Sequence, residues 1–151
     1  MRVTDELAHR TLATNAFNAS WSLLERERTR DEDLELLEVA LASRHHWRRE
    51  GGAQQVAIAD WMVSRCFAEL DEPRLALRFA MAALEAQPED APAWLRASLL
   101  EGLARAHASA GDALARADAI ARAEAALEGE ADPDDRAVIA EQLSTVPAAR
   151  S

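Results

Sequence analysis

The stretch 61–88 predicts two helices joined by a tight turn, and this unit constrains the fold more than any other part of the chain. Apolar residues recur at three- and four-residue steps on both sides of the turn, which is the period of a helix with one buried face. Asp71 and Glu72 end the first helix and Pro73 begins the second, because proline suits the first helical turn, where its missing N–H would be unpaired anyway. Small residues on the second helix let it lie close against the first, so the unit should form a helical hairpin.

Breaks of the same kind divide the whole chain into about seven helical segments. No stretch alternates apolar and polar residues with the β-branched enrichment of a strand, so we predict an all-α protein. The turns near Arg30, Asp71 and Gly111 lie roughly forty residues apart, which indicates an internal repeat. One hairpin alone cannot bury its apolar face, so the hairpins should stack to form a core. The predicted single domain, 1–151, contains hairpins at about 4–47, 53–87 and 92–128 and a capping helix at about 134–144.

Charge and composition argue against several classes of partner. The formal net charge is −10, whereas a protein that binds nucleic acid or an anionic membrane surface needs a positive footprint. The first residues are charged and lack the apolar run of a signal peptide, and no segment approaches the ~20 apolar residues of a membrane span. The single cysteine, Cys66, excludes an internal disulfide and fits a reducing compartment. We therefore expect a cytoplasmic protein that binds neither nucleic acid nor membrane.

Catalytic and metal-binding patterns are weak. The four histidines do not form the two-histidine spacing of a helical zinc site, and there is no second cysteine. Adjacent His45 and His46 are predicted to be structural or solvated, with a metal or acid–base role as the alternative. Cys66 has apolar neighbours, so a packed thiol is favoured over a nucleophile. We predict no enzyme activity, no metal and no cofactor.

Several motifs resemble a known repeat family. Large and small residues of the stretch 61–88 match the spacing of a tetratricopeptide repeat, namely Phe67, Ala76, Ala83, Leu84 and Pro88. Five further motifs together resemble a functionally uncharacterised group of bacterial tetratricopeptide-like proteins over about residues 15–128. They are N-x-x-W-x-L-L at 18–24, R-T at 28–29, A-S-R-H-H-W at 42–47, W-M-V-S-R at 61–65 and E-G-L-A-R at 101–105. The resemblance implies a short, right-handed solenoid of helical hairpins and supplies no activity.

A second stripe of residues on the first helix of each hairpin is the strongest functional signal. Arg65 and Arg105 are forty residues apart, so the repeat places them at equivalent positions, as it does Trp21 and Trp61. The family resemblance implies that this face lines a concave groove. The predicted groove residues are Asn18, Trp21, Trp61, Arg65, Trp94, Glu101 and Arg105.

An arginine pair flanked by tryptophans suits a ligand that combines a carboxylate or phosphate with apolar side chains, because guanidinium groups bind such anions in a bidentate way. The alternative is that the stripe only packs successive hairpins together and that the arginines pair with Glu101 or Asp60. The favoured hypothesis is a module that binds a protein or peptide segment in the groove. A structural homodimer without a separate ligand is the second hypothesis, and a small-molecule or metal-dependent enzyme is the third.

Overall fold

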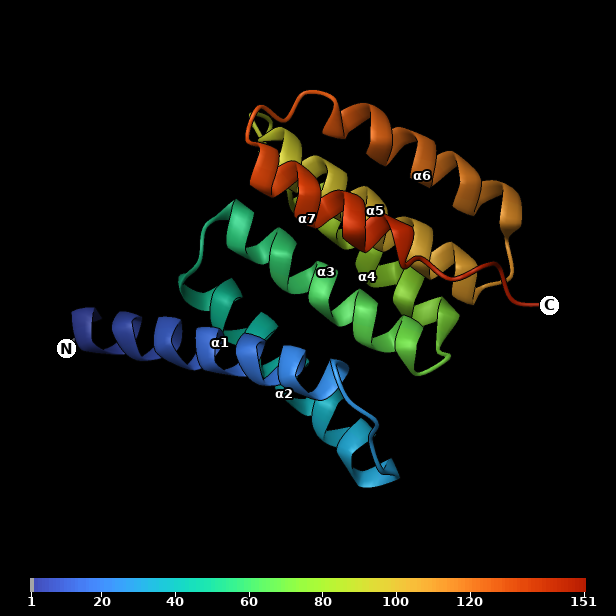
Figure 1. The fold of residues 1–151 in the computed structure, drawn as a ribbon. Coiled ribbons are helices and arrows are strands. Elements are labelled where there is room, and N and C mark those ends of the chain that lie inside the picture. Colours follow the sequence, from blue (N-terminus) through green and yellow to red (C-terminus); the bar gives the residue numbers. More distant parts are fainter. Residues whose placement is uncertain (1) are drawn as a thin grey trace.

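The computed structural model describes residues 2–151, and within that range it contains seven α-helices and no strand (Figure 1). The helices are α1 (Arg2–Leu24), α2 (Arg30–Glu50), α3 (Ala53–Glu69), α4 (Pro73–Ala86), α5 (Ala93–Ser109), α6 (Ala113–Leu127) and α7 (Pro133–Ser144). The predicted all-α class is confirmed. The bounds of two helices differ from the prediction, since α1 begins before Thr4 and α2 continues past Trp47 to the two glycines.

Consecutive helices pack as antiparallel hairpins. Helix α1 packs on α2, α3 on α4 and α5 on α6, and the contacts of α2 with α3 and of α4 with α5 join one hairpin to the next. The odd-numbered helices also follow one another, because α3 contacts both α1 and α5, and α5 contacts α7 (Figure 1). The contact between α1 and α3 is the smallest of these. The first hairpin therefore diverges from α3 on the side where α1 lies.

Two turns forty residues apart share one backbone conformation. Asp71 follows α3 with a φ of 61°, and Gly111 follows α5 with a φ of 77°. In both turns the next residue donates its N–H back into the preceding helix, from Glu72 to the Phe67 carbonyl and from Asp112 to that of His107. A left-handed residue with this bond is a common way to end a helix, because it satisfies carbonyls that the helix leaves free. The forty-residue spacing of these two turns is thus visible in the backbone as well as in the apolar pattern.

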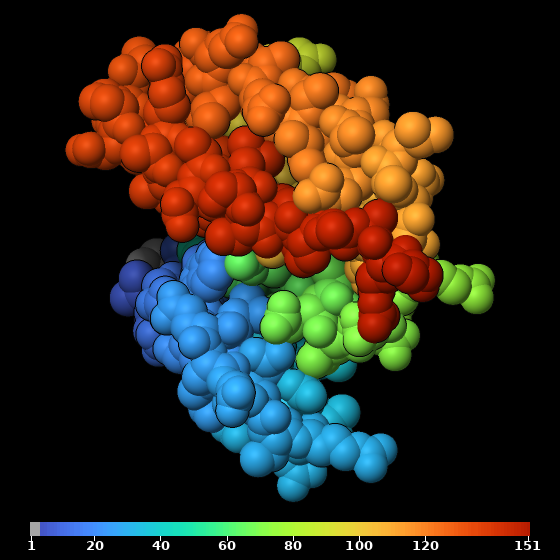
Figure 2. All heavy atoms as spheres, turned by 45° about the vertical axis from the view of Figure 1, so that its right-hand side comes forward, coloured from blue at the N-terminus to red at the C-terminus, as the bar shows by residue number. Residues whose placement is uncertain are grey.

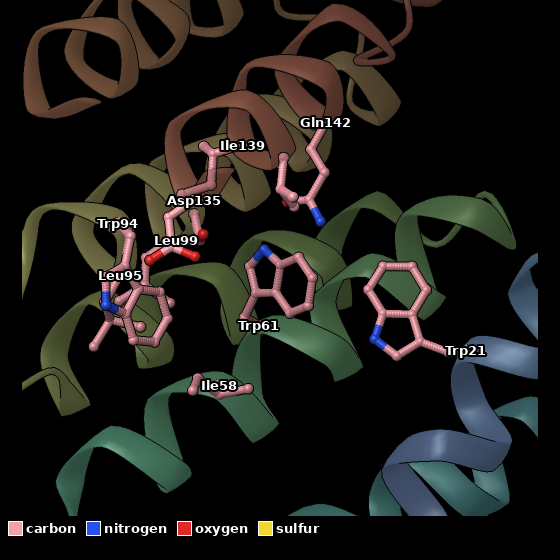
Figure 3. A pocket seen from close by; sticks show the side chains of 11 residues that line it. Trp21, Ile58, Trp61, Trp94, Leu95, Leu99, Asp135, Ile139 and Gln142 are labelled. Atoms are coloured by element: carbon pink, nitrogen blue, oxygen red, sulfur yellow. The ribbon is translucent and has the colours of Figure 1, made fainter. Parts of the chain in front are cut away.

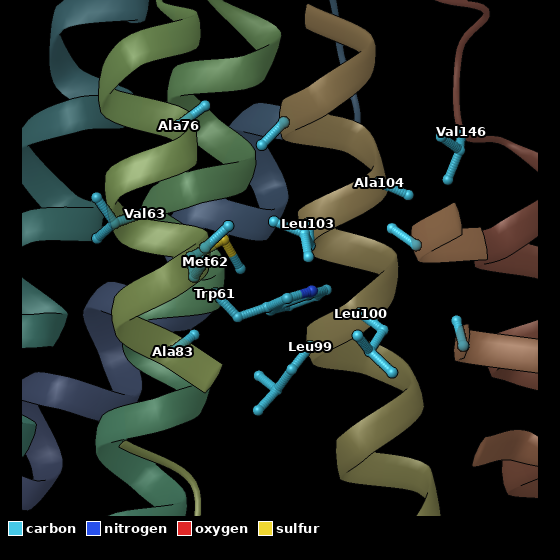
Figure 4. Packing of buried hydrophobic residues seen from close by; sticks show 14 of the residues in the cluster. Trp61, Met62, Val63, Ala76, Ala83, Leu99, Leu100, Leu103, Ala104 and Val146 are labelled. Carbon is cyan, nitrogen blue, oxygen red and sulfur yellow. The ribbon is translucent and has the colours of Figure 1, made fainter. Parts of the chain in front are cut away.

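The core lies between the hairpins and is made largely of aliphatic side chains (Figure 4). Ala76, Ala80 and Ala83 are buried on α4, which is how this helix comes close to α3. The Ser64 hydroxyl donates a 2.8 Å hydrogen bond to the Ala76 carbonyl across the same contact. The larger members of the core include Met62 on α3 and Leu99 on α5, and these two helices pack on each other.

The segment 145–151 returns from α7 across α6 and α5 (Figure 2). Arg116 donates to the carbonyls of Pro147 and Val146 at 2.6 Å and 3.0 Å. Further on, the Arg150 N–H donates to the Ala108 carbonyl, and its side chain pairs with Asp71 at 2.8 Å. The segment therefore ties the second and third hairpins together at the ends where their turns lie.

Among the residues that the structure describes, none of the helices combines the length and the apolar character needed to cross a lipid bilayer.

Candidate functional site

A fully buried carboxylate lies at the centre of the predicted groove residues. Glu101 on α5 has 0% of its surface exposed, and its side chain is held by three partners. Trp61 Nε1 donates to Oε2 at 3.1 Å, and Arg105 Nε donates to Oε1 at 2.8 Å. Arg65 Nη1 approaches the same Oε1 at 3.5 Å. A buried carboxylate is costly unless it is paired and hydrogen-bonded, so these four residues form one unit, which we call the Glu101 cluster.

Arg105 extends the Glu101 cluster to α7. Its Nη2 donates to the Gln142 carbonyl at 3.1 Å and to the Thr145 hydroxyl at 3.0 Å. These acceptors lie at the C-terminal end of α7, where a helix leaves carbonyls without internal partners and favours a positive charge. Arg105 therefore fastens the end of α7 to α5.

Arg65 extends the cluster toward α1. Its guanidinium carbon lies 5.0 Å from the centre of the Trp21 ring, which is within the range of a cation–π contact. The Trp21 and Trp61 rings are 5.8 Å apart and tilted by 52°. Burial, and then the charge of Arg105, lowers the pKa of Arg65, while Glu101 and Glu69 oppose this shift. The positive charge of Arg65 is thus already balanced by negative charges of the protein itself, those of Glu101 and Glu69.

Gly102 explains how an indole ring fits against α5. A Cβ atom at this position would lie 2.6 Å from Trp61 Cδ1 and 3.1 Å from Trp61 Nε1. No side chain tolerates such a separation, so glycine is needed for Trp61 to reach the carboxylate of the preceding residue. Trp61 is itself only 6% exposed.

A pocket of about 250 Å³ opens beside Trp61 (Figure 3). Three tryptophans from three helices line it, Trp21 from α1, Trp61 from α3 and Trp94 from α5. The remaining walls are mostly apolar and include four residues of α7. They are Ile58, Leu95, Ser98, Leu99, Asp135, Val138, Ile139 and Gln142.

A second hollow of about 160 Å³ adjoins the first at Ile58, which lines both. Its other walls are Thr14, Phe17, Trp47 and Gln55, from α1, α2 and α3. It lies where the first hairpin diverges from α3. We refer to the two pockets together as the tryptophan groove.

The structure divides the predicted groove residues into three groups. Trp21, Trp61 and Trp94 line the larger pocket. Arg65, Glu101 and Arg105 are brought together behind Trp61, and the carboxylate that the arginines hold is the protein's own. Asn18 is exposed on α1 and lines neither pocket. Asp60, the other acid considered for these arginines, pairs with Arg44 instead.

Sequence reasoning missed the contribution of α7. Asp135, Val138 and Ile139 line the larger pocket, yet α7 has no counterpart in the forty-residue repeat. Its apolar positions follow a helical spacing, which shows that one face of α7 is buried. That spacing does not show which helix covers this face. Trp47 and Gln55 were missed for a similar reason, since the second hollow depends on how far α1 lies from α3.

Other reactive side chains are outside the groove. Cys66 is buried in the core, and burial raises the pKa of its thiol to about 12. A thiol in that state is a poor nucleophile. Among the described side chains, no group of three or more His, Cys, Asp or Glu residues is arranged to hold a metal ion.

His9 on α1 and His46 on α2 face each other, with their Nδ1 atoms 2.7 Å apart. One ring must donate and the other accept, so double protonation would remove this hydrogen bond and place two like charges in contact. Burial, followed by the charges of His9, His45 and Arg49, lowers the pKa of His46. The neutral ring is thus favoured in the folded state.

We therefore predict that the His46 contribution to stability is present above pH 6.5, the ordinary pKa of histidine, and is lost as the pH falls through the lowered pKa. Urea unfolding at about pH 7.5 and about pH 5.5 measures it. The loss between the two pH values should be smaller for His46→Gln than for the wild type, and unchanged for the control His107→Gln on α5. Equal pH dependence in all three proteins would contradict the prediction.

No protein-family model matches the chain, and no curated protein or solved structure gives a significant match.

Proposed function

We propose that this protein is a tetratricopeptide-like interaction module, a short solenoid of helical hairpins that binds a protein or peptide segment in the tryptophan groove. The observation that carries the proposal is the convergence of three tryptophans, from α1, α3 and α5, on one open and mainly apolar pocket. Tryptophans in such positions often contribute much of the energy of a protein interface, because they add large contact area at a small entropic cost. The turns at Asp71 and Gly111, forty residues apart, support the repeat.

Each pocket of the groove, taken singly, has a size that suits an anchor side chain better than a free small molecule. Pockets for drug-sized ligands measure roughly 300–1,000 Å³, whereas the larger pocket here measures about 250 Å³. Apart from the tryptophans, its polar lining residues are Ser98, Asp135 and Gln142. That set offers no nucleophile with an adjacent base, so we propose a binding role without catalysis.

Self-association is the second candidate, and exposed leucines on the first hairpin favour it. Leu7 is 65% exposed and Leu12 50% exposed on α1, and Leu34 is 66% exposed on α2. Light-scattering mass across a concentration series tests this candidate. A mass that stays at the monomer value leaves the tryptophan groove open to a different partner.

Selection from a library of random peptides of about sixteen residues, four to five helical turns in length, tests the proposed function. We expect binders whose addition shifts tryptophan emission, since Trp21 and Trp94 are only partly buried. Ile58→Gln should weaken them about tenfold or more, because it removes the apolar wall shared by both pockets and places an amide under the ligand.

Ile120→Gln on α6 is the matched control for this experiment. It makes the same chemical change at another partly buried isoleucine packed on the core, away from both pockets. Its affinity for the selected peptides should equal that of the wild type. Binding in the tryptophan groove would be refuted if both variants lost the same affinity for the peptides. It would also be refuted if neither variant changed that affinity.

A further inference from the structure

The positive charges next to the groove are already used within the protein. Arg65 and Arg105 both point at Glu101, and Arg105 is also bonded to the end of α7. Neither guanidinium lines the pockets. An anionic group on a ligand would therefore have to compete with a fully buried carboxylate that holds both arginines.

The charge that does line the larger pocket is negative. Asp135 belongs to its wall, in the first turn of α7. Among the side chains that the structure describes, no arginine forms an ion pair with it, and its neighbour Arg136 donates instead to the Glu130 carbonyl.

Further acids surround Asp135. Burial, and then the charges of Asp132, Glu130 and Asp134, raises the pKa of the Asp135 carboxyl. The first turn of a helix favours one negative charge, but several acids together repel one another. A cation brought to this edge of the pocket would relieve that repulsion.

The groove also fixes the spacing of apolar contacts. Three residues of α3 follow one another at three-residue steps along the groove. Gln55 lines the second hollow, Ile58 lines both pockets, and Trp61 lines the larger pocket. Six residues of helix span about 9 Å. Two apolar side chains about two helical turns apart can therefore enter the two pockets together.

Resting on the proposed function, we infer that the occupant of the tryptophan groove is an amphipathic peptide segment with two apolar anchors and an arginine or lysine that pairs with Asp135. The net charge of −10 favours such a segment over a second copy, which would bring the same negative charge to an already acidic edge. Long-range attraction would also speed its association at low salt.

The composition of the selected peptides tests this inference. Binders lost in Ile58→Gln should carry a net positive charge together with two apolar residues about seven positions apart. One such peptide and its charge-reversed counterpart, with Lys and Arg replaced by Glu, are then compared by tryptophan emission. The basic peptide should bind about tenfold more tightly at about 50 mM salt, and salt of about 0.5 M should reduce the difference.

Asp135→Asn identifies the residue responsible. It should reduce the preference for the basic peptide about threefold or more. Asp31→Asn should preserve it, since Asp31 is an exposed acid in the first turn of α2 and lines neither pocket.

The failure of this inference is distinct from the failure of the proposed function. Groove-dependent binders that are neutral or acidic, or a preference unchanged in Asp135→Asn, overturn the basic partner and leave groove binding in place. The absence of any groove-dependent binder overturns both. A stable dimer whose tryptophans are protected, and become accessible in Ile58→Gln, overturns the foreign peptide in favour of a second copy.

Discussion

Replacing Glu101 by glutamine is expected to lower the free energy of unfolding by about 3–5 kcal/mol, the cost of removing one partner from a buried ion pair. Glutamine can still accept from Trp61, so the change mainly removes charge. Arg65 and Arg105 would then be left close together without the acid between them. The charged form of Arg65 is destabilised most, because burial and the charge of Arg105 already lower the pKa of this group.

Urea unfolding with linear extrapolation measures this loss. Glu124→Gln is the matched control, since Glu124 is exposed on α6 and the change should stay within about 0.5 kcal/mol. A loss below about 1 kcal/mol for Glu101→Gln would mean that the arginines reach water once released. In that case the Glu101 cluster would contribute no more to the free energy of unfolding than an exposed ion pair does, despite its burial.

Gly102→Ala is expected to destabilise the protein by about 1–3 kcal/mol, the usual cost of overpacking a core. The new methyl group would lie 2.6 Å from Trp61 Cδ1, so the indole must move and its bond to Glu101 must lengthen or break. This loss opposes the gain of about 1 kcal/mol that alanine brings to a helix interior. The sign of the change therefore reports how firmly Trp61 is held.

A double-mutant cycle with Trp61→Ala isolates the contact. In that background the indole is gone, so Gly102→Ala should be neutral or stabilising. Gly129→Ala is the control outside the cluster, because its added Cβ would meet neighbours only at ordinary separations of 3.4 Å and 3.5 Å. Stabilisation by Gly102→Ala in the wild type would contradict the close packing of Trp61 against Gly102.

The fold could be predicted because its signals are local. The turn before Pro73 and the glycines at 51 and 52 are readable from neighbouring residues alone, and α4 and α2 begin or end there. The forty-residue offset could be read from the same breaks. The early start of α1 could not, because the segment 2–10 contains no break that would place it.

The candidate site could be predicted only in part. The forty-residue offset pairs Arg65 with Arg105, and both arginines contact Glu101. Their other surroundings differ, because Arg65 faces Trp21 and Arg105 faces the end of α7. Arg105 is four residues after Glu101 on the same helix, so a pairing of these two residues could be read from the sequence. Whether Arg65 also reaches Glu101 depends on the separation between α3 and α5. Such a separation is a tertiary property, and no residue pattern within a single helix specifies it.

The Glu101 cluster also links two short motifs into one searchable unit. Tryptophan and arginine in W-x-x-x-R at 61–65 meet glutamate, glycine and arginine in E-G-x-x-R at 101–105. Each half is unfavourable alone: the second needs an indole and a cation for its glutamate, and the first needs a glycine that admits its ring. In homologous chains we expect the two motifs to be inherited or lost together. A related protein that carries both motifs at this spacing should contain the same buried cluster between neighbouring hairpins.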